Sequence, residues 1–81
     1  RELLEKKIAS LPYVKEVIPT NTNFILIRVD DADRLYYYLM KKGIIVRNRT
    51  HEPLLAGVLR VTVGSERENK SLMEALNGYK P

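Results

Sequence analysis

The sequence predicts an α+β domain, in which a small, mostly antiparallel sheet of three to four strands carries helices on one face. Apolar residues recur at helical spacing in three stretches, at the two ends and in the middle of the chain. Two pairs of short β-prone stretches lie between them. Because the links are short, the order helix, strand, strand, helix, strand, strand, helix favours antiparallel pairing and helices that pack together on one side.

Length and composition limit the class of protein. The 81 residues make at most one domain, residues 1–81, which can bury roughly 60–65% of its unfolded surface. Fourteen basic and ten acidic residues give a net charge of +4, but they are scattered, which argues against a nucleic-acid or membrane surface. The absence of cysteine excludes disulfides and thiolate sites. No membrane-length apolar run or signal peptide is present, so we expect a cytoplasmic protein.

The first helix is predicted from Leu4, Ile8 and Leu11, which recur at helical spacing with charged residues between them. Pro12 ends this helix. Arg1 already lies inside the pattern, with no methionine or capping residue before it. We therefore expect the chain to be a piece of a longer polypeptide.

The first two strands differ in character. Residues 13–18 form a short β-prone stretch bounded by Pro19 and the turn-forming residues 20–22. Residues 23–29 are more apolar, and neither face of this strand turns polar until Arg28. Such a strand is expected in the centre of the sheet with both faces covered. Helices on one side leave the other face bare, so we expect an exposed apolar face that docks on a partner.

The middle helix has both a start and a stop signal. Asp30 and Asp31 supply an N-cap and acidic charge for the first turn, and two lysines before Gly43 are typical of a helix end. The side chains of residues 36–38, all tyrosines, point about 100° apart, so one is expected to pack and the others to face solvent or a domain boundary. The predicted apolar stripe consists of Ala32, Leu35, Tyr36, Leu39 and Met40.

The last helix begins with a capping box made by Ser65 and Glu68. The cap explains Ser65 better than a nucleophilic role does, because no histidine has a place beside it. The helix is closed by Gly78 and Pro81, and its apolar side consists of Leu72, Met73, Leu76 and Tyr79.

The second strand pair carries the functional lead. Residues 44–48 and 58–63 read as two strands joined by a polar loop, and Arg60 alternates with Leu59, Val61 and Val63, so it points away from a core on their side. If the strands pair as a hairpin, Asn48 lies near Val58, and Arg47 lies near Leu59 and Arg60. Like charges placed opposite each other are destabilising, so two guanidinium groups without a carboxylate between them indicate an anion supplied from outside. The alternative is a pair of ordinary solvated strand arginines.

Other polar residues carry less information. His51 is a lone loop histidine that we expect in solvent, and no metal-ligand spacing occurs. Asn23 opens the central strand, either as a turn residue or as a residue that faces a ligand. No lysine occupies an apolar strand end, where a Schiff-base lysine is expected. We therefore assign no catalytic residue and no metal.

Three segments of the chain nevertheless form a pattern. Residues 22–26 read TNFIL, residues 43–47 read GIIVR, and residues 59–64 read LRVTVG with an acidic residue following. In order and spacing, over essentially the whole chain, they resemble the C-terminal small domain of the histidinol-phosphate aminotransferase family. These are pyridoxal-phosphate enzymes with the aspartate-aminotransferase fold.

The resemblance implies specific roles. The arginine that matches Arg60 grips the α-carboxylate of the amino-acid substrate, and the one that matches Arg47 reaches a distal phosphate or carboxylate. Asn23 matches a residue near the entrance to the site. The cofactor, pyridoxal 5'-phosphate, is bound by a large domain that this chain lacks. The full-length enzyme is implied to be a homodimer that transfers an amino group between histidinol phosphate and 2-oxoglutarate.

Some alternatives remain open. Gly64-Ser65 stands where a Gly-Thr pair is common, and residues 49–53 carry little of the family pattern, so another aminotransferase or a threonine-phosphate decarboxylase also fits. A stand-alone regulatory module that binds a small molecule through the arginines is a second class. A small RNA-binding sheet is a third, which the lack of aromatics among Val58, Arg60 and Thr62 disfavours.

Overall fold

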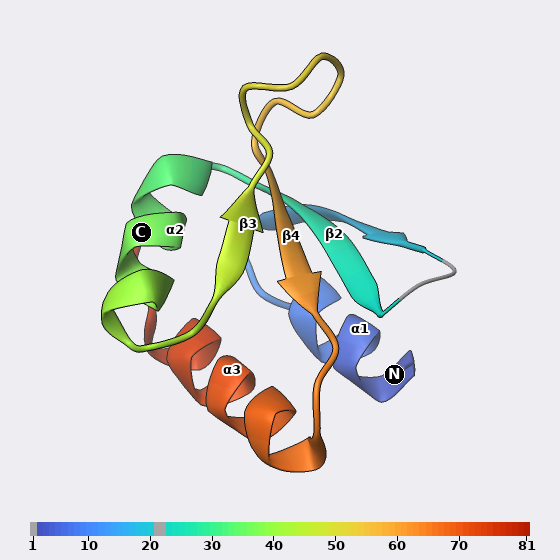
Figure 1. Cartoon of the computed structure of the whole chain (residues 1–81), viewed down its shortest axis with the longest axis vertical. Coiled ribbons are helices and arrows are strands. Elements are labelled where there is room, and N and C mark those ends of the chain that lie inside the picture. Colours follow the sequence, from blue (N-terminus) through green and yellow to red (C-terminus); the bar gives the residue numbers. More distant parts are fainter. Residues whose placement is uncertain (1, 21–22) are drawn as a thin grey trace.

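The computed structural model describes residues 2–20 and 23–81, so the predicted turn at residues 20–22 lies partly outside the described residues. The predicted order of elements is confirmed (Figure 1). The elements are α1 (Glu2–Ala9), β1 (Val14–Pro19), β2 (Phe24–Val29), α2 (Ala32–Lys41), β3 (Val46–Asn48), β4 (Val58–Thr62) and α3 (Glu66–Gly78).

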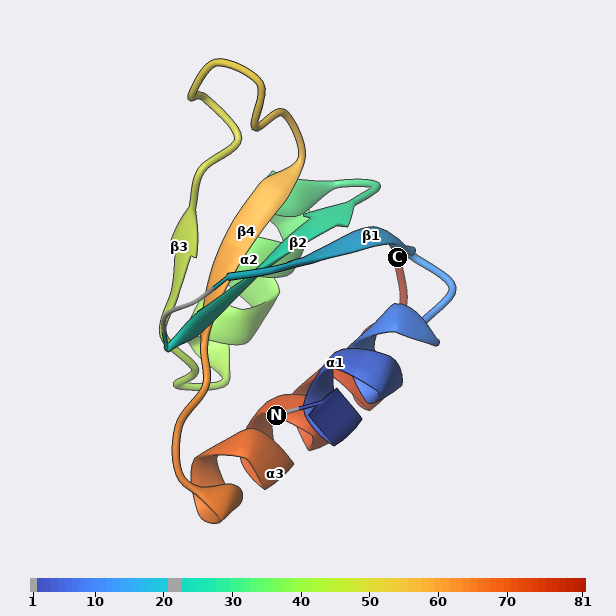
Figure 2. The ribbon, with the colours of Figure 1, turned by 90° about the vertical axis from the view of Figure 1, so that its right-hand side faces the viewer.

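The four strands form one sheet in the order β1-β2-β4-β3, and every neighbouring pair is antiparallel. The apolar strand β2 is central, as its composition predicts. The helices α1 and α3 run along the same side of the sheet in Figure 2, and α2 packs on that side as well. The core between the layers consists mainly of Leu4, Ile8, Ile25, Ile27, Leu35, Leu39, Leu59, Val61, Leu72 and Leu76.

The opposite face of the sheet carries no helix among the described elements, and we call it the open face. Strand alternation places Phe24, Leu26 and Arg28 of β2 on it, and all three are half-buried. Val58 also lies on this side and outside the core cluster, yet it is fully buried. Ile45, just before β3, is 88% exposed. The predicted apolar face is therefore present, although only part of it is bare.

The predicted start of β3 at Ile44 is wrong by two residues, because the end of α2 uses the backbone of Ile44. The N–H of Ile44 donates to the carbonyl of Leu39 and the N–H of Gly43 to that of Met40, while Gly43 has a φ of 79°. This is the Schellman arrangement of a helix C-terminus. Since Ile44 caps the helix, the sheet pairing begins only at Val46.

The apolar stripe of α2 also differs from its prediction. Met40 is 50% exposed, whereas Tyr36 and Tyr38 are both half-buried and Tyr37 is 58% exposed. The Tyr38 hydroxyl donates to the carbonyl of Ala75 at 2.7 Å, and this bond to α3 draws Tyr38 inward. Two of the three consecutive tyrosines therefore pack, not one.

A cluster of three tyrosines ties the helical layer to the sheet. The ring of Tyr79 lies 5.0 Å from that of Tyr13 and 4.9 Å from that of Tyr38. The buried Tyr13 hydroxyl donates to the carbonyl of Leu76 at 2.6 Å. Both hydroxyl bonds end on carbonyls of the last turn of α3, where the usual partners within the helix run out. The Leu76 carbonyl also accepts a bond from the N–H of Tyr79 at 3.3 Å. The cluster thereby fixes the C-terminal end of α3 against the rest of the fold.

Candidate anion-binding site on the open face

Arg47 and Arg60 are directly opposite each other in the antiparallel pair of β3 and β4. Residues paired in this way project to the same face, with Cβ atoms about 5 Å apart. The prediction that Arg47 lies near Arg60 is confirmed. The predicted partner of Asn48 is wrong by one residue, because Asn48 pairs with Leu59 and not with Val58.

The core explains this register. Val46 and Val61 are both buried, and they pair one position before the arginines. A slip by one residue would move Val46 to the open face and Arg47 into the core. The burial of one valine pair therefore sets the two arginines side by side.

Neither arginine of this pair has a carboxylate partner among the described residues. Two other arginines do have one: Arg28 contacts Glu16 at 3.2 Å, and Arg49 is paired with Glu52. Arg28 lies on the same open face, so acidic residues are compatible with this face where the sequence places them. The unmatched positive charge of Arg47 and Arg60 therefore favours an anion from outside the described part of the chain.

Arg60 is half-buried, and its guanidinium has a defined environment. The guanidinium carbon lies 4.3 Å from the centre of the Phe24 ring. The Nε atom is buried and has no hydrogen-bond partner among the described residues. A buried N–H without an acceptor costs about 1–3 kcal/mol. A ligand that accepts a hydrogen bond from this nitrogen would recover that free energy.

Phe24 is a residue that the sequence reasoning missed. The sequence predicts a strand that is apolar on both faces, and the residues considered for the open face, Val58, Arg60 and Thr62, include no aromatic residue. Phe24 pairs with Thr62, two positions from the Leu26–Arg60 pair on the same strands. The two-residue alternation of Phe24, Leu26 and Arg28 predicts that this ring lies on the open face. Only the pairing of β2 with β4 places it beside Arg60.

The structure does not bring Asn23 to the arginine pair. Asn23 is exposed just before β2, and its backbone carbonyl accepts a bond from the N–H of Val63. Arg60 pairs with Leu26, which is three residues after Asn23, so the two positions are about 10 Å apart along the strand. A shared site at Arg47, Arg60 and Asn23 would therefore need a ligand that spans this length.

The loop between β3 and β4 is held by hydrogen bonds. The Thr50 hydroxyl accepts a bond from the N–H of Gly57 at 2.8 Å, and Arg28 donates to the carbonyls of Ala56 and Leu54. His51 is exposed, and Leu54, at φ 67°, is 93% exposed. These bonds fix the ends of the two strands that carry the arginine pair.

Two comparisons link the chain to known proteins. It is 49% identical over 79 residues to a histidinol-phosphate aminotransferase from Bacteroides fragilis and 40% identical over 76 residues to one from Flavobacterium psychrophilum. These matches cover 98% and 94% of this chain. No protein-family model matches the chain. The solved structure of the histidinol-phosphate aminotransferase from Clostridium acetobutylicum superposes with a TM-score of 0.86 at 25% identity, over 96% of this chain.

The chain corresponds to one segment of the histidinol-phosphate aminotransferases. It spans 22–23% of the length of the two curated relatives and 24% of the solved chain. The resemblance in the three sequence motifs therefore agrees with whole-chain similarity and with the fold.

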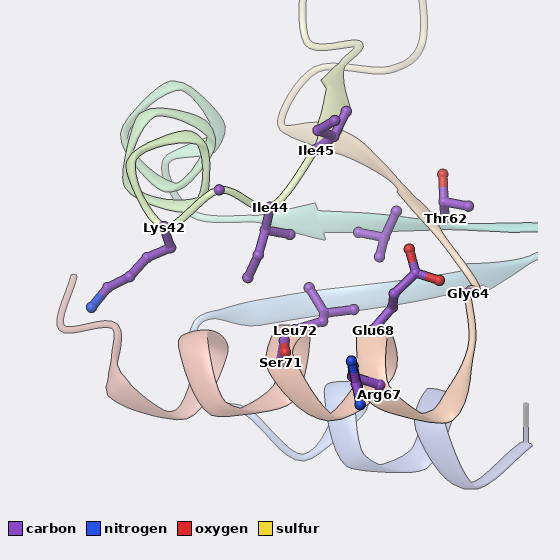
Figure 3. Close-up of a pocket in the computed structure, with 11 residues that line it drawn as sticks. Lys42, Ile44, Ile45, Thr62, Gly64, Arg67, Glu68, Ser71 and Leu72 are labelled. Carbon is purple, nitrogen blue, oxygen red and sulfur yellow. The ribbon is translucent and has the colours of Figure 1, made fainter.

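A separate cavity lies on the helical side of the sheet (Figure 3). Its volume is about 490 Å³, and its lining includes Lys42, Ile44, Thr62, Arg67 and Glu68. In Figure 3 Lys42 extends outward, away from Arg67, and its ammonium lies 5.6 Å from the centre of the Tyr38 ring. The Glu68 carboxylate accepts a bond from the Ser65 N–H within the capping box. The basic groups do not converge here, so this cavity is a poorer anion site than the open face.

Among the described residues, no group of three or more histidine, aspartate and glutamate side chains could hold a metal ion. No helix in the described part is long and apolar enough to cross a lipid bilayer.

Proposed function

We propose that this chain is the C-terminal small domain of a pyridoxal-phosphate-dependent histidinol-phosphate aminotransferase, a substrate-binding part that is inert alone. The full-length enzyme would transfer an amino group between histidinol phosphate and 2-oxoglutarate. The observation that carries the proposal is the Arg47–Arg60 pair, which lies on one face of the sheet without an acidic partner among the described residues. The similarity of the chain to these enzymes supports it.

In this proposal each arginine receives a different anion. Arg60 binds the α-carboxylate of glutamate, because its planar guanidinium can donate two parallel hydrogen bonds and so fixes orientation as well as charge. Arg47 binds the more distant anion, the phosphate of histidinol phosphate or the side-chain carboxylate of glutamate. Its exposed position suits the outer end of a substrate. Asn23 has at most a minor contact near the entrance of the site.

The described residues do not fit the cofactor. The chain's lysines are all exposed, whereas a Schiff-base lysine requires a desolvated or electropositive setting that lowers its pKa. We therefore place pyridoxal phosphate, which supplies the electron sink for amino transfer, in a large domain of the same polypeptide outside this chain. The contribution of this chain is to hold and orient substrate anions.

The remaining proposals concern the assembly. We place the large domain against the open face, where Phe24 and Leu26 are only half-buried. On the same family assignment, we propose that the full-length enzyme is a homodimer and that it acts in the cytoplasm. Nucleic acid and membrane are not proposed as partners.

The test is an assay of the full-length polypeptide that contains this chain. Incubation with histidinol phosphate and 2-oxoglutarate should yield glutamate. Release of CO2 from a phosphorylated amino acid, without glutamate formation, would instead identify a decarboxylase. The isolated 81-residue chain should bind glutamate or a phosphate ester at millimolar concentration or more weakly, and tight binding would favour a regulatory module.

A further inference from the structure

Phe24 contacts the guanidinium group to which we assign the substrate carboxylate. We propose that Phe24 is a positioning residue, which holds Arg60 so that its hydrogen-bond donors meet the α-carboxylate of an amino-acid substrate. This inference rests on the proposed function and adds a residue to it.

The strand pairing places the ring and the cation within reach of each other. Phe24 pairs with Thr62, and Arg60 pairs with Leu26, so Phe24 and Arg60 are diagonal neighbours on the open face. Diagonal neighbours lie about 7–8 Å apart at the backbone, which aromatic and long side chains can span. The separation of 4.3 Å between the guanidinium carbon and the ring centre is well within cation–π range.

A ring is suited to this task because it leaves the donors of Arg60 free. The ring attracts the cation through its face, whereas the N–H bonds of a guanidinium lie in the guanidinium plane. A carboxylate in place of the ring would instead occupy those N–H groups. Arg28 shows that case on the same face, because its nitrogens donate to Glu16 and to the loop carbonyls of Ala56 and Leu54.

The burial of the Arg60 Nε atom fits the same role. This N–H has no acceptor among the described residues, so a donor is present that folding leaves unused. An arginine side chain is flexible, and holding it in one place before the ligand arrives reduces the ordering cost of binding. Phe24 should therefore favour glutamate over an analogue of glutamate that lacks the α-carboxylate.

The experiment compares variants of the full-length enzyme with two amino donors, L-glutamate and 4-aminobutyrate, which is glutamate without its α-carboxylate. Phe24→Leu removes the ring face, Phe24→Tyr keeps it, and Ile18→Val trims another half-buried residue of the open face as a control. Phe24→Leu is also made in an Arg60→Ala background, which gives a double-mutant cycle. Phe24→Met replaces Phe24→Leu if the latter does not fold.

We expect Phe24→Leu to lower kcat/KM for L-glutamate by about 5- to 30-fold, mostly through KM, as loss of a partly desolvated cation–π contact predicts. In Phe24→Leu, the ratio of kcat/KM for L-glutamate to kcat/KM for 4-aminobutyrate should fall by a similar factor. Phe24→Tyr should keep that ratio, and Phe24→Leu should cost less than about twofold in the Arg60→Ala background.

An equal loss from Phe24→Leu in both backgrounds, or a loss no larger than that of Ile18→Val, would overturn the role of Phe24 alone. Full activity of Arg60→Ala on L-glutamate would instead refute the assignment of Arg60, and with it the role of Phe24.

Discussion

Arg47 and Arg60 face each other across two antiparallel strands, and no carboxylate lies between them in the described residues. Folding alone gains nothing from this arrangement, since like charges directly opposite each other repel. The buried pair of Val46 and Val61 imposes it one position away. The molecule therefore uses core packing to hold two cations together for a ligand.

Replacement of Arg47 should reveal this repulsion. We expect Arg47→Ala to raise the free energy of unfolding of the 81-residue chain by about 0.2–1 kcal/mol, because it removes the like charge opposite Arg60. Arg28→Ala is the matched control, and it should lower that free energy, since Arg28 loses Glu16 and two loop carbonyls. Urea unfolding at low ionic strength measures both. A stability loss in Arg47→Ala would show that Arg47 is stabilised by partners within the fold.

Tyr13 should make stability fall at alkaline pH. Burial, followed by the nearby Tyr38 and Tyr79, raises the pKa of Tyr13 from 10.0 to about 12. The unfolded chain loses this proton first, so the contribution is complete below pH 10.0 and disappears as the pH rises toward about 12. Tyr13→Phe should flatten this decline, as followed by urea unfolding at several pH values. The exposed Tyr37 provides the control, and an equal change in Tyr37→Phe would contradict the account.

The capping box of α3 should contribute to stability in a way that a mid-helix serine does not. The Ser65 hydroxyl accepts a bond from the N–H of Glu68 at 3.2 Å, so Ser65→Ala should cost about 0.5–2 kcal/mol. Ser71 is exposed within α3, and Ser71→Ala should be neutral or slightly stabilising, because alanine is the better helix former. Urea unfolding of the two variants checks this difference. Equal effects would mean that the cap is not formed in solution.

Much of the fold could be predicted because the spacing of apolar residues and the capping residues determine the helices and strands locally. The order of elements, the central position of residues 23–29 and the caps at Asp31 and Ser65 all follow from neighbouring residues. The hairpin pattern predicts that Arg47 and Arg60 lie on neighbouring strands, although not their exact pairing. The start of β3 could not be predicted in this way, because the backbone of Ile44 was already used to end α2.

The finer details of the site depend on contacts between distant parts of the chain. The hairpin loop is long enough to permit more than one register, and the core pair of Val46 and Val61 selects the observed one. The contact of Phe24 with Arg60 requires the pairing of β2 with β4, across more than 30 residues of sequence. The same non-local pairing explains why Phe24 was missed.

In the proposed function Arg60 binds the carboxylate of the substrate. The most direct test is the kcat/KM of the full-length enzyme for L-glutamate after Arg60→Ala. We expect KM to rise and kcat/KM to fall, with a loss of transition-state stabilisation of about 2–4 kcal/mol. Arg60→Lys should recover little of this loss, because lysine lacks the planar guanidinium that donates two parallel hydrogen bonds. An Arg60→Ala enzyme with the kcat/KM of the unmodified enzyme would contradict the account.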